Sequence, residues 1–143
     1  LAVGAYMAVN ACGEIYDQDK ILAGALADDD RTIISSHRLM LEGYERNMGG
    51  NTSIGCIITN ADLTKTECRM VSTMAHDGLA RSIRPVHTSM DGDTLFTMAS
   101  GEVKTTIDTV GYLAEEAVRL AVLDAAASAE GMGGRPAYRD IIK

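Results

Sequence analysis

Aromatic residues are scarce in this chain, and tryptophan is absent. Phe, Trp and Tyr together make up 4% of the 143 residues, so few side chains are available to stack on nucleic-acid bases. Basic residues are also in the minority, with 13 Lys and Arg against 20 Asp and Glu, which gives a net charge of −7. Phosphate backbones and anionic membrane surfaces repel such a chain. We therefore expect neither nucleic acid nor membrane as a partner.

Cysteine and long apolar runs are scarce as well. The three cysteines, Cys12, Cys56 and Cys68, are odd in number and lack metal-type spacing, so they predict neither a disulfide framework nor a zinc site. We expect no metal and a reducing compartment, the cytoplasm. No stretch reaches the roughly 18 apolar residues of a membrane span, and no basic-headed signal peptide is present. The sequence opens without Met inside the apolar run Leu1–Val9, which we interpret as truncation.

The remaining composition is typical of one soluble globular domain. Hydrophobic residues make up 46% of the chain and charged residues 23%, and 143 residues are enough to bury a sizeable core. Segments that favour strands alternate with segments that favour helices, without the glycine patterns of nucleotide-binding folds. The sequence therefore predicts a mixed α/β (α+β) domain.

Three segments predict strands, and the first two of them are expected to be buried. They are Leu1–Cys12, with the strand ending near Asn10, then Ser53–Asn60, and then Asp93–Ala99. Each is short and bounded by turn residues, as buried strands are.

Two longer segments predict helices. Thr64 and Glu67 form a capping-box pattern at the start of a helix over Thr64–Ile83. The second predicted helix, Thr109–Glu130, is rich in Ala and is followed by Gly131 as its stop signal. Three- and four-residue steps place one set of residues of the first helix on a single face, which we expect to be buried: Cys68, Val71, Ala75 and Leu79.

The segment between the first two strands is interpreted as a connection. Gly13–Asp30 is turn-rich and acidic, with Ile21–Leu26 as a short apolar island. Residues 28–51 read as a linker, in which Thr32–Met48 has a helical pattern that ends at the breaker Gly49-Gly50.

The most informative stretch is Gly49-Gly50-Asn51-Thr52, where a hydroxyl residue follows a flexible glycine pair and begins a strand. A self-cleaving Thr needs this arrangement, because its hydroxyl must reach the carbonyl of the preceding residue. Cleavage would leave Thr52 with a free α-amine, and such an amine, with a pKa of about 8, can serve as base for its own hydroxyl. The alternative is a simple turn that leads into a strand.

Two further signals accompany this junction. Asp91-Gly92-Asp93 places two carboxylates around a glycine before the third strand, where they can orient a nucleophile. The alternatives are an exposed turn or a cation-binding loop. The side-chain amide of Asn10 can donate to an oxyanion, or Asn10 is an ordinary residue of a strand-end turn.

Other polar residues have simpler interpretations. His76 and His87 are expected at a helix end and in a turn, since their spacing fits no common set of metal ligands. Arg81 and Arg84 either bind a substrate carboxylate or complement the helix dipole or an acidic neighbour. Cys56 is expected in the core.

The block Asn51–Gly101 closely resembles the DmpA-type L-aminopeptidase/D-esterase family, which also includes hydrolases of nylon-derived aminohexanoate oligomers. The resemblance covers nearly the whole chain. The matching parts are the Asn51-Thr52 junction, Thr59–Ala61, His76–Arg81, Arg84–Thr88, Asp91–Thr94 and, upstream, Val9–Ala11, Gly13 and Ile21–Ala25.

This resemblance implies a precursor that cleaves itself between Asn51 and Thr52, with Thr52 as the new amino-terminal nucleophile. Ser53 is the neighbouring hydroxyl, but the family pattern places cleavage one residue earlier. Asp91 and Asp93 match the two assisting positions of the family, and the family's oxyanion asparagine falls on Asn10. No cofactor is implied.

The implied fold is an αββα sandwich, here incomplete at the amino end, where relatives supply further strands and a Lys or Tyr of the active site. Residues 1–51 would end the α-chain region, residues 52–143 would form the β-chain region, and together they would make one domain. Relatives form homo-oligomers such as tetramers.

The expected function is an aminopeptidase or amidohydrolase that cleaves amide or ester bonds in small peptides. One alternative is a self-processing module of the same fold that serves binding or assembly. Another is a plain globular domain that never cleaves.

Overall fold

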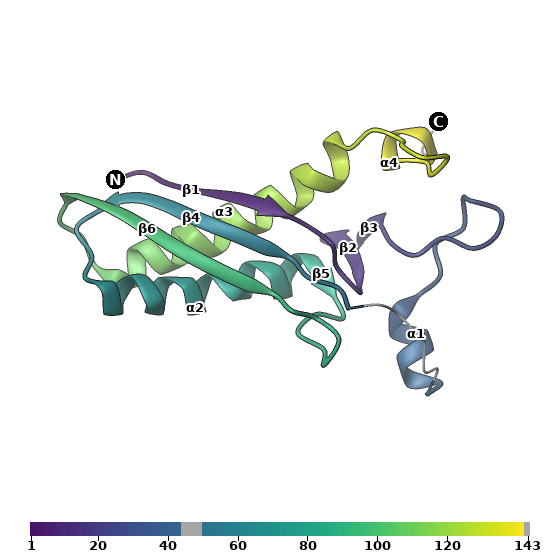
Figure 1. Ribbon diagram of the computed structural model, residues 1–143, viewed down its shortest axis with the longest axis horizontal. Coiled ribbons are helices and arrows are strands. Elements are labelled where there is room, and N and C mark those ends of the chain that lie inside the picture. The colour runs from purple at the N-terminus through teal and green to yellow at the C-terminus, as the bar shows by residue number, and fades with distance from the viewer. Residues whose placement is uncertain (44–49, 142–143) are drawn as a thin grey trace.

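The computed structural model describes residues 1–43 and 50–141 (Figure 1). Its larger sheet contains β1 (Val3–Ala8), β4 (Ile54–Ala61) and β6 (Thr94–Val103) in the order β1-β4-β6. β1 runs antiparallel to β4, and β6 runs parallel to it. The three predicted strands therefore exist and form one sheet, with the second strand at its centre.

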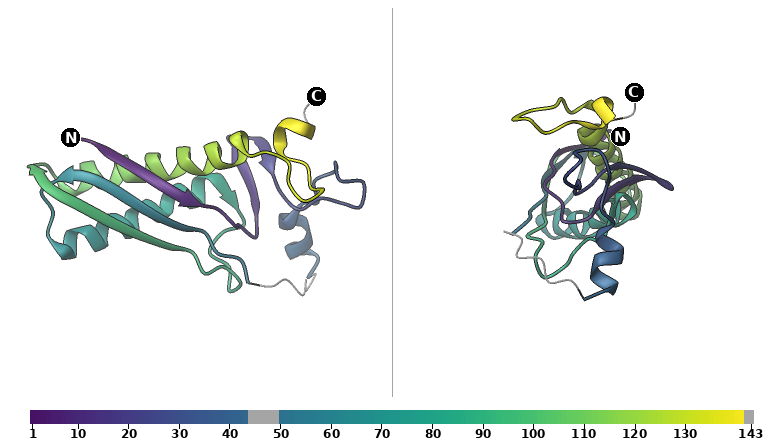
Figure 2. Two further views of the ribbon diagram at one scale, coloured as in Figure 1. Left: turned by 45° about the horizontal axis from the view of Figure 1, so that its top comes forward. Right: turned by 90° about the vertical axis from the view of Figure 1, so that its right-hand side faces the viewer.

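Two long helices lie side by side against one face of this sheet, as Figures 1 and 2 show. α2 (Lys65–Ser82) begins with the predicted capping box, in which Thr64 and Glu67 bond to each other's backbone N–H. α3 (Ile107–Ser128) has Thr106 as its N-cap, two to three residues earlier than the sequence pattern predicts. Together with the sheet, these helices confirm the mixed α/β class.

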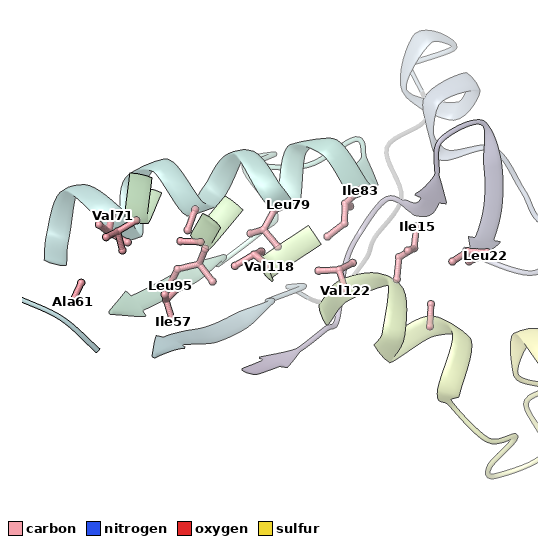
Figure 3. Packing of buried hydrophobic residues seen from close by; sticks show 14 residues of the cluster. Ile15, Leu22, Ile57, Ala61, Val71, Leu79, Ile83, Leu95, Val118 and Val122 are labelled. Carbon is pink, nitrogen blue, oxygen red and sulfur yellow. The ribbon is translucent and has the colours of Figure 1, made fainter. Parts of the chain in front are cut away.

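The core lies between the helices and the sheet (Figure 3). The predicted face of α2 supplies Val71, Ala75 and Leu79, all fully buried, whereas Cys68 is only half-buried. The other members of the cluster come from α3, the sheets and the chain between them: Ile15, Leu22, Ile57, Ala61, Ile83, Leu95, Val110, Ala114, Val118, Val122 and Ala126. These are mostly β-branched and small side chains, in keeping with the scarcity of aromatic residues.

The helices approach each other closely at Gly78 of α2. A side chain at this position would collide with the backbone of α3 at Glu115 and Arg119. Nearby, Arg81 forms ion pairs with Glu115 and Glu116 across the same helix pair. Arg81 thus has acidic neighbours, which was one of the two roles considered for it.

The opposite face of the larger sheet is uncovered within the described residues. Side chains alternate along β1 and β4 between the helix layer and this open face, so the prediction of wholly buried strands is wrong for this side. Cys56 lies on the open face and is half-buried, not in the core. The large apolar residues exposed there are Tyr6, Ile54, Ile58, Phe96 and Met98.

A second small sheet has the order β3-β2-β5. β2 (Glu14–Asp17) and β3 (Lys20–Ala23) form a hairpin, and β2 also pairs with β5 (Ile83–Arg84), directly after α2. The interpretation of residues 14–23 as part of a connection is therefore wrong. Ile15 and Leu22 join the core, but acidic and polar neighbours hide the strand pattern in the sequence.

Two short helices complete the described chain. α1 (Ser36–Leu41) is capped by Ser35, and the buried carboxylate of Glu14 accepts a hydrogen bond from the N–H of Ser36. α1 forms only part of the helix predicted over Thr32–Met48, since residues 32–35 are not helical. Residues 44–49, including Gly49, lie outside the described residues. α4 (Tyr138–Ile141) lies near the carboxyl end. Over residues 1–43 and 50–141, no helix is long and apolar enough to cross a membrane.

Candidate active site

Thr52 lies where two parallel strands begin. β4 and β6 pair with Ile54 beside Thr94, and the pairing extends backwards to a bridge between Asn51 and Asp91. Because the strands are parallel and in register, the start of one lies next to the start of the other. The two segments singled out by the sequence are therefore neighbours at one edge of the sheet.

The peptide bond between Asn51 and Thr52 is held on both sides. Its carbonyl oxygen, on Asn51, accepts a hydrogen bond from the N–H of Gly92 at 2.8 Å, and its N–H, on Thr52, donates to the carbonyl of Asn10 at 3.0 Å. The side chain of Asn51 donates to the carbonyl of Ala11 at 3.1 Å. The end of β1 and the turn before β6 thus fix this peptide in place.

The two hydroxyl residues at this position face opposite sides of the sheet. Thr52 is exposed, whereas Ser53 is completely buried and its hydroxyl has no hydrogen-bond partner in the described part of the chain. Of these two residues, only Thr52 is exposed to solvent and to an incoming molecule. This difference favours Thr52 over Ser53 as a nucleophile.

The carboxylate of Asp93 contacts the residue that follows the candidate nucleophile and a histidine of the turn before β6. One oxygen accepts a hydrogen bond from the N–H of Ser53 at 2.9 Å, and the other lies 3.3 Å from Nδ1 of His87. The Asp93 side chain is only 4% exposed, and this second oxygen has no hydrogen-bond partner in the described part of the chain. In residues 1–43 and 50–141, Thr52 donates no hydrogen bond to either Asp91 or Asp93.

Asp91 and Asn10 stabilise turns around the site. One oxygen of Asp91 accepts hydrogen bonds from both the N–H and the hydroxyl of Thr88, at 3.0 and 2.7 Å. Asn10 reaches Thr52 through its backbone carbonyl, while the residue itself is exposed. The structure thus brings all the predicted site residues to one edge of the sheet, and their individual catalytic roles stay predictions.

The two histidines meet next to this site. His76, in α2, and His87, in the turn before β6, have ring centroids 5.1 Å apart. The pKa of His76 is lowered, mainly by burial of the ring and to a smaller extent by the neighbouring His87. Both rings line a cavity of about 420 Å³. No cluster of three metal-ligating side chains occurs among the described residues.

Two hydrogen-bonding groups of the site could not be predicted from the sequence because they belong to the backbone. The N–H of Gly92 and the carbonyl of Asn10 hold the junction, yet neither depends on a side chain. In the sequence, the only indication that Gly92 belongs to the site is its position between two aspartates. Arg84 lies over the ring of Tyr16, 4.8 Å from its centroid, which adds a contact not considered from the sequence.

The arrangement has the parts of an acyl-transfer site: an exposed hydroxyl residue, a fixed carbonyl next to it, hydrogen-bond donors, and one buried and one half-buried carboxylate. Comparison with known proteins agrees with this class. The sequence profile of peptidase family S58 matches residues 1–139. The chain belongs to peptidase family S58, which confirms the resemblance to the DmpA-type hydrolases.

Several similar proteins are described by name as peptidases or amide hydrolases. An uncharacterized aminopeptidase of Mycobacterium leprae is 34% identical over 95% of this chain and 43% of its own length. An uncharacterized aminopeptidase of Mycobacterium tuberculosis is 39% identical over 64% of this chain and 31% of its own. A 6-aminohexanoate-oligomer endohydrolase of Paenarthrobacter ureafaciens is 41% identical over 38% of this chain and 15% of its own. The chain spans less than half the length of these relatives.

Proposed function

We propose that this chain carries the active site of a self-processing N-terminal-nucleophile hydrolase. Its substrates are small peptides or other linear amides and esters, and Thr52 is the nucleophile after cleavage of the Asn51-Thr52 bond. The observation that carries the proposal is the exposed hydroxyl residue Thr52 beside a peptide bond that is hydrogen-bonded on both sides, in a chain of peptidase family S58.

Self-cleavage begins with attack by the Thr52 hydroxyl on the carbonyl carbon of Asn51. The carbon–nitrogen bond then breaks, the hydroxyl proton passes to the departing nitrogen, and an ester joins Asn51 to Thr52. Water hydrolyses this ester and leaves Asn51 with a free carboxylate and Thr52 with a free hydroxyl and α-amine. The products are a chain that ends at residue 51 and a chain that begins at residue 52.

Turnover uses the same hydroxyl. The α-amine of Thr52 accepts the hydroxyl proton as the oxygen attacks the substrate carbonyl, because an α-amine with a pKa of about 8 is partly neutral at pH 7. The side-chain amide of Asn10 donates to the oxyanion. Asp93, held by Ser53 and His87, and Asp91, held by Thr88, keep the hydroxyl and amine aligned. No cofactor takes part in these steps.

The assembled fold is proposed to be the αββα sandwich of the family. A second sheet would cover the open face of β1, β4 and β6, where Tyr6, Phe96 and Met98 are 82%, 55% and 63% exposed. Monomeric soluble proteins rarely leave so large an apolar patch on their surface. We also propose a homo-oligomer, in line with the family resemblance.

Intact mass of the full-length protein tests the self-cleavage. We expect a fragment that begins at Thr52 in the wild type and a single unbroken chain in Thr52→Ala. An amino-acyl nitroanilide assay on the same samples then tests turnover, which should require the cleaved form. An unbroken wild-type protein that still hydrolyses the substrate would refute the proposal. Cleavage without any turnover would indicate a binding or assembly module instead.

A further inference from the structure

We propose that Gly92 is a catalytic residue of the self-cleavage step. Its backbone N–H stabilises the oxyanion that forms on the Asn51 carbonyl, and its lack of a side chain leaves room for the attacking hydroxyl of Thr52. This inference rests on the proposed function and assigns two further requirements of the same reaction to one residue.

The N–H of Gly92 already points at the reacting oxygen. It donates to the carbonyl oxygen of Asn51 at 2.8 Å before the reaction, and stabilisation requires it to lie 2.7–3.1 Å from the position that this oxygen takes as an oxyanion. When the Thr52 oxygen bonds to the carbonyl carbon, the electron pair of the C=O bond moves onto this oxygen. The negative charge therefore develops on an atom that already has a donor.

The donor is fixed in place by its surroundings. The carbonyl oxygen of Gly92 accepts a hydrogen bond from the Thr94 hydroxyl at 3.1 Å, and on the other side Asp91 is tied to Thr88 by backbone and side-chain bonds. A donor that is fixed before the reaction loses little free energy in reorganisation as charge develops. The turn around Gly92 thus presents its N–H ready for the reaction.

The space beside Gly92 is occupied by the nucleophile itself. A Cβ atom added at Gly92 would lie 2.8 Å from Oγ1 of Thr52 and 3.7 Å from its Cβ. Gly92 does not adopt the left-handed backbone conformation, unlike Gly101 with a φ of 82°, so conformational freedom does not explain the glycine. A larger residue would be accommodated by rotation of the Thr52 side chain, which would displace the attacking hydroxyl. The glycine is therefore required for cleavage more than for folding.

The rate of self-cleavage in freshly synthesised full-length protein tests both requirements. Gly92→Ala should slow cleavage by at least ~10-fold, because displacement of a reacting group by about 1 Å can cost ~10²-fold in rate. The control is Ser53→Ala on the other side of Thr52. Ser53 is buried and its hydroxyl has no hydrogen-bond partner among the described residues, so this variant should cleave like the wild type.

A second variant isolates the N–H. Semisynthesis can replace Gly92 by glycolate, which exchanges the N–H for an oxygen and adds no side chain. Loss of one oxyanion donor should slow cleavage by about 10²–10³-fold. Hydrogen exchange at the Gly92 amide in Thr52→Ala should also show protection, as expected for a donor bonded to an uncleaved Asn51.

The outcomes separate this inference from the proposed function. If the wild type cleaves, Thr52→Ala does not, and both Gly92 variants cleave at the wild-type rate, the role of Gly92 is overturned and Thr52 remains the nucleophile. If the wild type never cleaves at Asn51-Thr52, the proposed function fails and the role of Gly92 fails with it. Should Gly92→Ala not fold, the glycolate variant decides the result.

Discussion

The backbone N–H of Thr52 donates a hydrogen bond to the carbonyl oxygen of Asn10 at 3.0 Å. This bond joins the end of β1 to the start of β4, two segments about 40 residues apart in sequence. In the proposed cleaved enzyme, the nitrogen in this bond becomes the α-amine of Thr52. The Asn10 carbonyl would then hold that amine where the peptide nitrogen was, so cleavage would need little rearrangement of the site.

Ser53→Ala should leave self-cleavage unchanged, in contrast to Thr52→Ala. Ser53 is fully buried and its hydroxyl has no partner among the described residues, so it can neither attack a carbonyl nor contribute a hydrogen bond. Its removal should leave the free energy of unfolding the same or raise it by up to about 1 kcal/mol, because a buried unpaired polar group is costly. Intact mass and urea denaturation measure the two effects. Loss of cleavage in Ser53→Ala would point to Ser53 as the nucleophile.

Asp93→Asn should slow self-cleavage and turnover by roughly 10²-fold, the scale of a lost acid–base or aligning group. The substitution keeps the size of the side chain and leaves an oxygen to accept the N–H of Ser53, so the fold should persist. Only the negative charge beside His87 is lost. The rate of appearance of the Thr52 fragment measures the effect, with circular dichroism as the control for folding. A wild-type rate would remove Asp93 from the mechanism.

Gly78→Ala should lower the free energy of unfolding by about 1–3 kcal/mol, the usual cost of overpacking. A Cβ at Gly78 would collide with the backbone of α3, which cannot move aside as a side chain can. The matched control is Gly50→Ala before β4, where an added Cβ meets only the carbonyl oxygen of Met90 at 3.9 Å. That control should be neutral or slightly stabilising, since Ala loses less entropy on folding. Urea midpoints of the two variants test the difference, and equal midpoints would contradict it.

Stability should fall as the pH drops below about 6.5, and His76 should account for part of the loss. Burial and His87 lower the pKa of His76 in the folded state, although Asp93 and Asp77 partly oppose this. Between the lowered pKa and the ordinary value near 6.5, the unfolded chain binds the proton more readily, so acid favours unfolding. Stability gained from the neutral ring is therefore present above pH ~6.5 and is lost as pH falls toward the folded-state pKa.

His76→Gln should flatten this dependence, as measured by urea midpoints between pH 7.5 and 5. His37→Gln, at an exposed position of α1, is the control and should keep the wild-type slope. An unchanged slope in His76→Gln would show that other groups cause the loss.

The sequence was sufficient where the signal is local. Thr64 and Glu67 fix the start of α2 because the capping box needs only residues three apart, and the spacing of Val71, Ala75 and Leu79 identifies the buried face. The apolar strands around Ile57 and Leu95 were visible for the same reason. Motif resemblance, in turn, placed the chain in its family.

The local signal failed where partners distant in sequence decide the outcome. The hairpin of β2 and β3 was missed because Glu14, Asp17 and Lys20 are charged, and only pairing with β5 and burial of Ile15 make it part of the core. The open face of β1 was likewise invisible, since an apolar residue such as Tyr6 looks the same whether or not another layer covers it.

The candidate site shows the same division. The sequence by itself determined that Thr52 follows Asn51 at a strand start and that Asp91 and Asp93 precede another strand. Only the tertiary structure decided that the strands are parallel and in register, which places Gly92 against the Asn51 carbonyl and Asn10 against the Thr52 nitrogen. The reason is that these contacts are made by backbone N–H and C=O groups, which every residue but proline has in common. Their positions depend on strand register and cannot be predicted from the identities of the residues.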